Sequence, residues 1–188
     1  MAAWLIIGAL VLVLIYAVFL YNGLVQIKHN VSKAWSNIDV LLKQRHDELP
    51  KLVEACKQYK QFEQATLQRV TDARGRVASA SQAGDVRALG AAEGALRAGL
   101  GQIFAVAEAY PELRANENFS QLMARITGLE EAIADRREFY NECVNINNAR
   151  IEQFPENFIA DLFGFLPRHL LTFNDEELRD VDVKALFG

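Results

Sequence analysis

The feature that most constrains this chain is an uncharged apolar run close to its start. Residues 2–25 read AAWLIIGALVLVLIYAVFLYNGLV and contain no Asp, Glu, Lys or Arg. About 20 apolar residues, rising 1.5 Å each in a helix, cross the roughly 30 Å hydrocarbon core of a bilayer. Trp4, Tyr16 and Tyr21 suit the membrane–water interfaces. The run therefore predicts an uncleaved transmembrane signal anchor over residues 1–25, in preference to a cleaved signal peptide or a buried core helix.

Basic residues follow this run but do not precede it. Lys28 and Lys33 lie close to it, and Lys43 and Arg45 lie farther along the chain. The positive-inside rule then predicts an N-terminus outside the cytoplasm and a body in the cytoplasm. We therefore expect a single-pass protein whose first partner is the lipid bilayer.

The body, residues 26–155, has the spacing of amphipathic helices throughout. We predict one helix that continues from the apolar run and three more over about 48–82, 86–110 and 118–153. A turn at Arg45–Asp47, just before Pro50, separates the first two; a continuous helix through Pro50 is the alternative. Gly84 and Asp85 predict a second join, and Asn118 with Gln121 resembles a capping box. The predicted fold is all-α, a transmembrane helix continuing into an up-and-down antiparallel four-helix bundle.

Residues 156–188 have a different composition from the body. The stretch NFIADLFGFLP predicts a short apolar turn or helix that folds back over the end of the bundle, and contact with a membrane surface is the alternative. An acidic tail follows, in which Val181 and Val183 are candidates for a short extended contact. The sequence thus divides into an anchor (1–25), a bundle (26–155) and this C-terminal segment (156–188).

The residue types that usually carry catalysis lack the spacing that catalysis needs. The residues three before the histidines are Gln26, Lys43 and Leu166, so the Glu-x-x-His pairs of di-iron bundles are missing. Zinc, phosphate-loop, nucleophile-elbow and dinucleotide motifs are missing as well. The single thiols Cys56 and Cys143 are predicted to act as small core-facing hydrophobes. We expect no catalytic residue, no cofactor and no metal site.

One group of polar residues is a candidate interaction site. Its members are Asp39, Glu54, Asp135, Arg136, Arg137, Tyr140 and Asn141. Arg136 falls where the apolar stripe of its helix calls for an apolar residue, so its charge must be paired, reach solvent or lie near the bundle end. One hypothesis is a buried ion pair with Asp39 or Glu54 that sets the register of the helices. The other is a polar docking surface or ligand pocket.

The same stretches resemble a known family. VSKAWSNIDVLLKQRHDELPKLVEACKQY, AYPELRANENFSQL, IADRREFYNECVNINNARI and FPENFIADLFGF are similar, in order and spacing, to blocks of the LemA family. The resemblance implies a bacterial single-pass membrane protein with a four-helix bundle beside the membrane. It implies neither an enzymatic activity nor a cofactor, so it transfers no catalytic residue. Cys56, Cys143 and the tail after Leu166 depart from the family pattern.

These observations predict a scaffold or interaction protein at the bacterial inner (cytoplasmic) membrane, without enzymatic activity. We expect it to pair with further copies of itself, with other membrane proteins, or with both. Residues 28–151 carry 17 Lys and Arg against 16 Asp and Glu, so no basic excess points to nucleic acid as a partner. The alternative is a sensory or small-ligand-binding module coupled to the membrane, with its pocket at Arg136.

Overall fold

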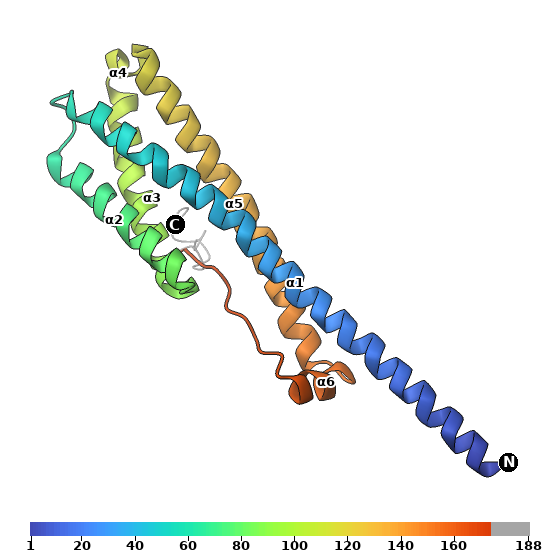
Figure 1. The fold of residues 1–188 in the computed structure, drawn as a ribbon. Coiled ribbons are helices and arrows are strands. Elements are labelled where there is room, and N and C mark those ends of the chain that lie inside the picture. Colours follow the sequence, from blue (N-terminus) through green and yellow to red (C-terminus); the bar gives the residue numbers. More distant parts are fainter. Residues whose placement is uncertain (174–188) are drawn as a thin grey trace, which may run out of the picture. The chain divides into compact units, whose positions relative to one another are not determined.

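The computed structural model describes residues 1–173, and every regular element in that part of the chain is a helix. The elements are α1 (Ala2–Lys57), α2 (Gln64–Ala83), α3 (Val86–Ala109), α4 (Pro111–Ala115), α5 (Glu117–Glu152) and α6 (Glu156–Phe163) (Figure 1). The all-α class and the apolar first helix are confirmed. The up-and-down four-helix arrangement and the three-part division of the chain stay predictions. Val181 and Val183 lie outside the described residues.

The turn predicted at Arg45–Asp47 is wrong, because α1 continues through Pro50 to Lys57. Proline in a helix lacks the N–H that would donate to the carbonyl four residues earlier, which here belongs to His46. Arg74 of α2 supplies the missing donor, since its Nε lies 2.9 Å from the His46 carbonyl oxygen. The alternative, a continuous helix through Pro50, is therefore the one that the structure adopts.

This contact makes the effect of an Arg74 substitution depend on Pro50. We expect Arg74→Met to lower the free energy of unfolding by about 1–3 kcal/mol, because the His46 carbonyl loses its charged donor. In a Pro50→Ala background the new N–H at position 50 can donate to that carbonyl, so the same substitution should cost clearly less. Urea unfolding of the four proteins, followed by circular dichroism, measures the coupling. Equal losses in both backgrounds would contradict the exchange of donors.

The turn between α1 and α2 lies instead at residues 58–63, where an aromatic cluster holds it. The rings of Tyr59 and Phe62 lie 6.4 and 6.1 Å from the ring of Phe119 at the start of α5. The Asn116 side chain donates to the Tyr59 hydroxyl at 3.0 Å. Burial of Phe62 and Phe119 thus places the reversal about three helical turns later than Pro50 suggested.

The later helix ends follow the sequence signals in one case and depart from them in another. Gly84 adopts a left-handed conformation after α2, and the Asp85 carboxylate accepts from two backbone N–H groups at the start of α3, as predicted. The capping box at Asn118 is wrong. Asn116 takes that place, accepting from the Phe119 N–H at 3.0 Å, because the short helix α4 brings the chain into α5 two residues earlier.

Contacts divide the chain into two compact units, and both α1 and α5 contribute to each. Unit 1 contains Met1–Ile38 and Arg136–Leu170. Its two long helices meet where the Trp35 ring lies 5.5 Å from the Tyr140 ring. The buried apolar side chains of unit 1 are those of Leu24, Val31, Ala34, Ile38, Tyr140, Cys143, Val144 and Ala160.

Unit 2 contains Asp39–Asp135 and the segment from Leu171 onward, described to Phe173. Its α2 and α3 pack against each other, with Gly99 so close to Val70 that an added Cβ would lie 2.7 Å from the valine methyl. Leu171 and Phe173 are buried, and the Thr172 backbone passes directly over Gly90. The backbone of α3 is therefore closely approached by its neighbours at Gly90 and Gly99.

Candidate functional site

The core of unit 2 contains a charged network built around Arg45, whose side chain is 1% exposed. Its Nη2 donates to Oε1 of Glu93 on α3, and its Nη1 donates to Oε1 of Glu130 on α5. Arg97 of α3 donates from Nε to the second Glu130 oxygen at 3.1 Å. Two cations and two carboxylates thus balance, and the network links α1, α3 and α5.

The balance of charge keeps Arg45 ionised although it is buried. Burial by itself lowers the pKa of the guanidinium, but the carboxylates of Glu93 and Glu130 outweigh it and raise that pKa. Arg45 Nε and Glu93 Oε2 are buried without hydrogen-bond partners among the described residues. A buried ionic network with unpaired atoms contributes less to stability than to the choice of which helix faces meet. We interpret it as the device that sets helix register in unit 2.

Arg45, and not Arg136, is the buried cation. Arg136 is exposed, so the expectation that it forms a buried register-setting ion pair is wrong. The stripe on α5 runs through Ile126, Glu130, Ile133, Arg137 and Tyr140, in steps of four and three, and passes beside Arg136. The register-setting pair itself exists, but on different residues.

The other predicted residues of the polar group do not form one cluster with Arg136. Asp39 and Glu54 lie on α1 fifteen positions apart, or about 22 Å along the helix. Asp39 accepts from Lys43 and Ser81, and Glu54 from Lys57. Asp135 is exposed on the unit 2 part of α5, and the remaining three residues, Arg137, Tyr140 and Asn141, lie on its unit 1 part. Their role in binding a partner stays a prediction.

Three polar side chains of α5 hold an extended segment in unit 1. The Asn148 side chain accepts from the Arg168 N–H at 2.8 Å and donates to the Arg168 carbonyl at 2.9 Å. Tyr140 donates to the His169 carbonyl at 3.1 Å, and Asn147 to the Leu166 carbonyl at 3.4 Å. Burial raises the pKa of the Tyr140 phenol, so the hydroxyl stays a donor. No pattern in the sequence predicted this role of the asparagines.

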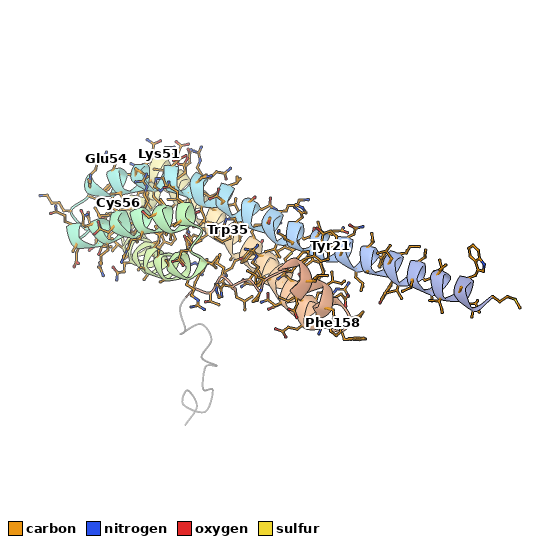
Figure 2. The ribbon with its side chains drawn as sticks, turned by 60° about the horizontal axis from the view of Figure 1, so that its bottom comes forward. Tyr21, Trp35, Lys51, Glu54, Cys56 and Phe158 are labelled. Carbon is orange, nitrogen blue, oxygen red and sulfur yellow. The ribbon has the colours of Figure 1, made fainter. Side chains whose placement is uncertain are left out.

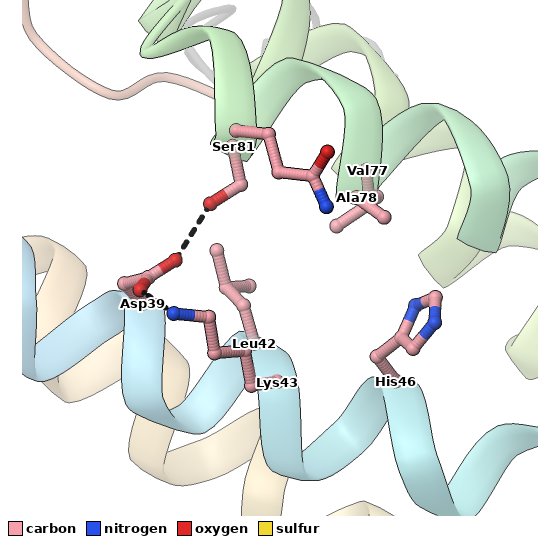
Figure 3. Close-up of a pocket in the computed structure, with 8 residues that line it drawn as sticks. Asp39, Leu42, Lys43, His46, Val77, Ala78 and Ser81 are labelled. Carbon is pink, nitrogen blue, oxygen red and sulfur yellow. Dashed lines mark hydrogen bonds and ion pairs between the residues drawn. The ribbon is translucent and has the colours of Figure 1, made fainter.

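A small cavity of about 100 Å³ lies between α1 and α2 in unit 2 (Figure 3). Asp39, His46 and Ser81 line it, a combination that could suggest a nucleophile with its base. The hydrogen bonds are wrong for that chemistry, because Ser81 donates to Asp39 at 2.8 Å while His46 Nδ1 is buried without a partner among the described residues. Burial and Arg74 lower the pKa of His46, so it is neutral at pH 7.

Both thiols are buried, and burial raises the pKa of each, for Cys56 to about 12. In the Cys143→Ala protein at pH 7.5 we expect Cys56 to react with iodoacetamide about 10³-fold more slowly than an exposed thiol, because only the thiolate is nucleophilic. A Ser120→Cys thiol on the exposed face of α5, in a protein lacking both native thiols, is the matched control. Similar rates for the two thiols would contradict a structural role for Cys56.

The fold and the site define a class: in the described part of the chain, an all-helical protein with one helix long and apolar enough to cross a membrane and a buried ionic network that links its helices. Within residues 1–173, no three His, Cys, Asp or Glu side chains are grouped so that they could hold a metal ion. The sequence profile of the LemA family matches residues 34–185, and the chain belongs to that family.

The chain is also similar to curated magnetosome proteins. Magnetosome proteins MamQ 1 and MamQ 2 of Paramagnetospirillum magneticum are each 25% identical over 168 residues, covering 77% of this chain and 62% of their own lengths. Magnetosome protein MamQ of Magnetospirillum gryphiswaldense is 23% identical over the same coverage. The chain therefore spans less than two thirds of these relatives.

Proposed function

We propose that this protein is a membrane-anchored interaction protein without catalytic activity, which crosses the inner membrane once through α1 and assembles there with further copies. One observation carries the proposal. Residues 2–16 of this apolar helix are all exposed, and none of its most apolar stretch is buried by the rest of the described chain. Such a surface needs lipid or other apolar helices around it.

Lateral assembly follows from the physics of such a helix. In a bilayer the helix is already surrounded by apolar material, so association depends on close packing between helices. Because α1 is one helix from Ala2 to Lys57, copies that pack along the span also bring their cytoplasmic segments of α1 together. The ligand-binding alternative placed its pocket at Arg136, and the exposure of that side chain favours the interaction function over it.

Cysteine scanning along the span tests the assembly. Single cysteines at positions 5–14, in the protein with Cys56→Ala and Cys143→Ala, are oxidised in native membranes. We expect disulfide-linked dimers at positions that recur every three to four residues, which is the spacing of one helix face. Tenfold dilution with lipid controls for random collisions and should leave this pattern unchanged. Monomer at every position, with no cross-linked partner, would overturn the proposal.

A second experiment tests the orientation. We expect proteinase K added to intact spheroplasts to leave residues 26–188 uncut, because Lys28 and Lys33 favour the cytoplasmic side for the segment that follows the span. The same protease should digest the body once the membrane is permeabilised with detergent. Immunoblotting of a C-terminal tag reads both results. Digestion in intact spheroplasts would reverse the proposed orientation.

A further inference from the structure

Helix α6 exposes an apolar face that the described part of unit 1 leaves uncovered. Phe158 and Leu162 of α6, with Phe154 just before its start, recur every four residues and are 64%, 75% and 79% exposed. Figure 2 shows Phe158 on the side of α6 that faces away from α1. The opposite face is closed by Ala160, which is buried, and by Glu156, which pairs with Arg150 at 2.7 Å. A helix that is packed on one face and apolar on the other needs an apolar environment outside the protein fold for its exposed face.

The position of this face along α1 is known. The Phe163 and Phe165 rings lie 4.7 and 5.9 Å from the ring of Tyr21. Tyr21 stands near the end of the uncharged run, which extends to Ile27. The aromatic end of α6 therefore lies at the level where the apolar surface of α1 stops, which in a spanning helix is the edge of the hydrocarbon layer.

A basic cavity lies directly beyond the aromatic contact. It has a volume of about 370 Å³ and is lined by Tyr21 and Val25 and by three basic side chains, Lys28, His29 and Arg168. Lys28 follows Tyr21 by two helical turns, or about 10 Å. The Asn148 side chain fixes the Arg168 backbone through two hydrogen bonds, so this part of the cavity wall is already formed.

We propose that α6 and residues 163–168 form a membrane foot, which lies in the interface of the bilayer that α1 crosses and receives the phosphate of an anionic phospholipid between Lys28, His29 and Arg168. The inference rests on the proposed anchoring. Apolar groups followed by basic groups along α1 reproduce the order of the hydrocarbon edge and the headgroup phosphates. Asn157 and Asp161 form a separate polar stripe on α6, as expected of a helix that lies flat in this layer.

Depth measurements with nitroxides test the foot in the full-length chain. Labels are placed at Phe158→Cys, Val11→Cys and Asn145→Cys, each without Cys56 and Cys143, in vesicles of phosphatidylcholine and phosphatidylglycerol at 7:3. The collision rate of each label with oxygen reports its exposure to lipid, and the rate with a nickel chelate reports its exposure to water. We expect labels at 11 and 158 to favour oxygen and the label at 145, on an exposed polar position of α5, to favour nickel.

The three labels separate failure of the foot from failure of the anchor. A water-like label at 158 beside a lipid-like label at 11 would overturn the foot and leave the anchor intact. A water-like label at 11 would overturn the anchor itself. A label at 158 that neither reagent reaches would mean that protein covers α6, which also overturns the foot.

Lipid selectivity tests the cavity. Electron spin resonance of spin-labelled lipids measures how much more strongly phosphatidylglycerol than phosphatidylcholine associates with the protein. We expect a selectivity of several-fold that falls close to one in the Lys28→Gln, Arg168→Gln protein. The matched control, Lys51→Gln with Lys57→Gln, removes two exposed basic side chains farther along α1 and should keep the selectivity. Unchanged selectivity in the first variant, or its loss on adding 10 mM inorganic phosphate, would overturn a lipid site.

Discussion

Arg45→Met in the full-length protein is expected to lower the free energy of unfolding by about 3–5 kcal/mol, measured by urea unfolding in detergent. The reason is that Glu93 is fully buried and Arg45 is its ion-pair partner, whereas Glu130 keeps Arg97. Burial raises the pKa of the Glu93 carboxyl, and Arg45 opposes that rise. Without Arg45 the folded-state pKa of Glu93 is raised further, and a raised pKa costs stability as the carboxyl ionises with rising pH. The loss of unfolding free energy in the variant should therefore be smaller at pH 5 than at pH 8.

A paired substitution distinguishes two causes of the stability loss, the unbalanced charge of Glu93 and the lost packing of Arg45. In Arg45→Met, Glu93→Gln the buried carboxylate is removed together with its cation, so we expect most of the lost stability to return and the added pH dependence to vanish. Arg136→Met, which truncates an exposed arginine, is the matched control and should change stability by less than about 0.5 kcal/mol. A loss below 1 kcal/mol for Arg45→Met would show that the substitution does not leave Glu93 as an unbalanced buried charge.

Gly90→Ala is expected to release the segment 171–173 from α3. An added Cβ would lie 2.0 Å from the backbone oxygen of Thr172, and backbone cannot step aside as a flexible side chain can. Leu171 and Phe173 would then lose their burial, including the contact of the Phe173 ring with the Arg97 guanidinium at 5.1 Å. We expect a loss of about 2–4 kcal/mol of stability and faster hydrogen exchange at residues 171–173.

Gly101→Ala supplies the matched control on the same helix. A Cβ at Gly101 meets nothing within 4 Å, so only the higher helix propensity of alanine acts. This substitution should raise the stability by up to about 1 kcal/mol. Opposite signs for the two glycines confirm that the Thr172 backbone is seated on α3. Equal effects would contradict it.

The sequence does contain a signal for the charged network. The apolar stripes of α1 and α3 each continue, without a break in spacing, through one charged residue. On α1 the stripe is Ile38, Leu42, Arg45, Leu49, Leu52 and Cys56, and on α3 it is Leu89, Glu93, Leu96, Leu100 and Ile103. Each has steps of four and three with one charged member. A turn at Arg45–Asp47 would end the first stripe before its cation, so the prediction of that turn leaves Arg45 outside the core and assigns the buried pair to Arg136.

Local chemistry alone was enough for several features. An uncharged run up to Ile27 predicts a membrane span, a glycine followed by aspartate predicts the end of one helix and the start of the next, and apolar periodicity predicts helices throughout. These signals work because the hydrocarbon thickness, the left-handed glycine and the 3.6-residue turn do not depend on what the chain packs against.

Tertiary structure decided what depends on a partner from elsewhere in the chain. Pro50 remains inside α1 because Arg74, 24 residues later, supplies a donor to the His46 carbonyl. Arg45 is buried because Glu93 and Glu130 reach it from two other helices. Lys28 and Arg168 line one cavity because the Asn148 side chain holds the backbone of Arg168 in place. Propensity and spacing describe one helix at a time, whereas each of these outcomes is a balance between a desolvated group and a distant residue that satisfies it.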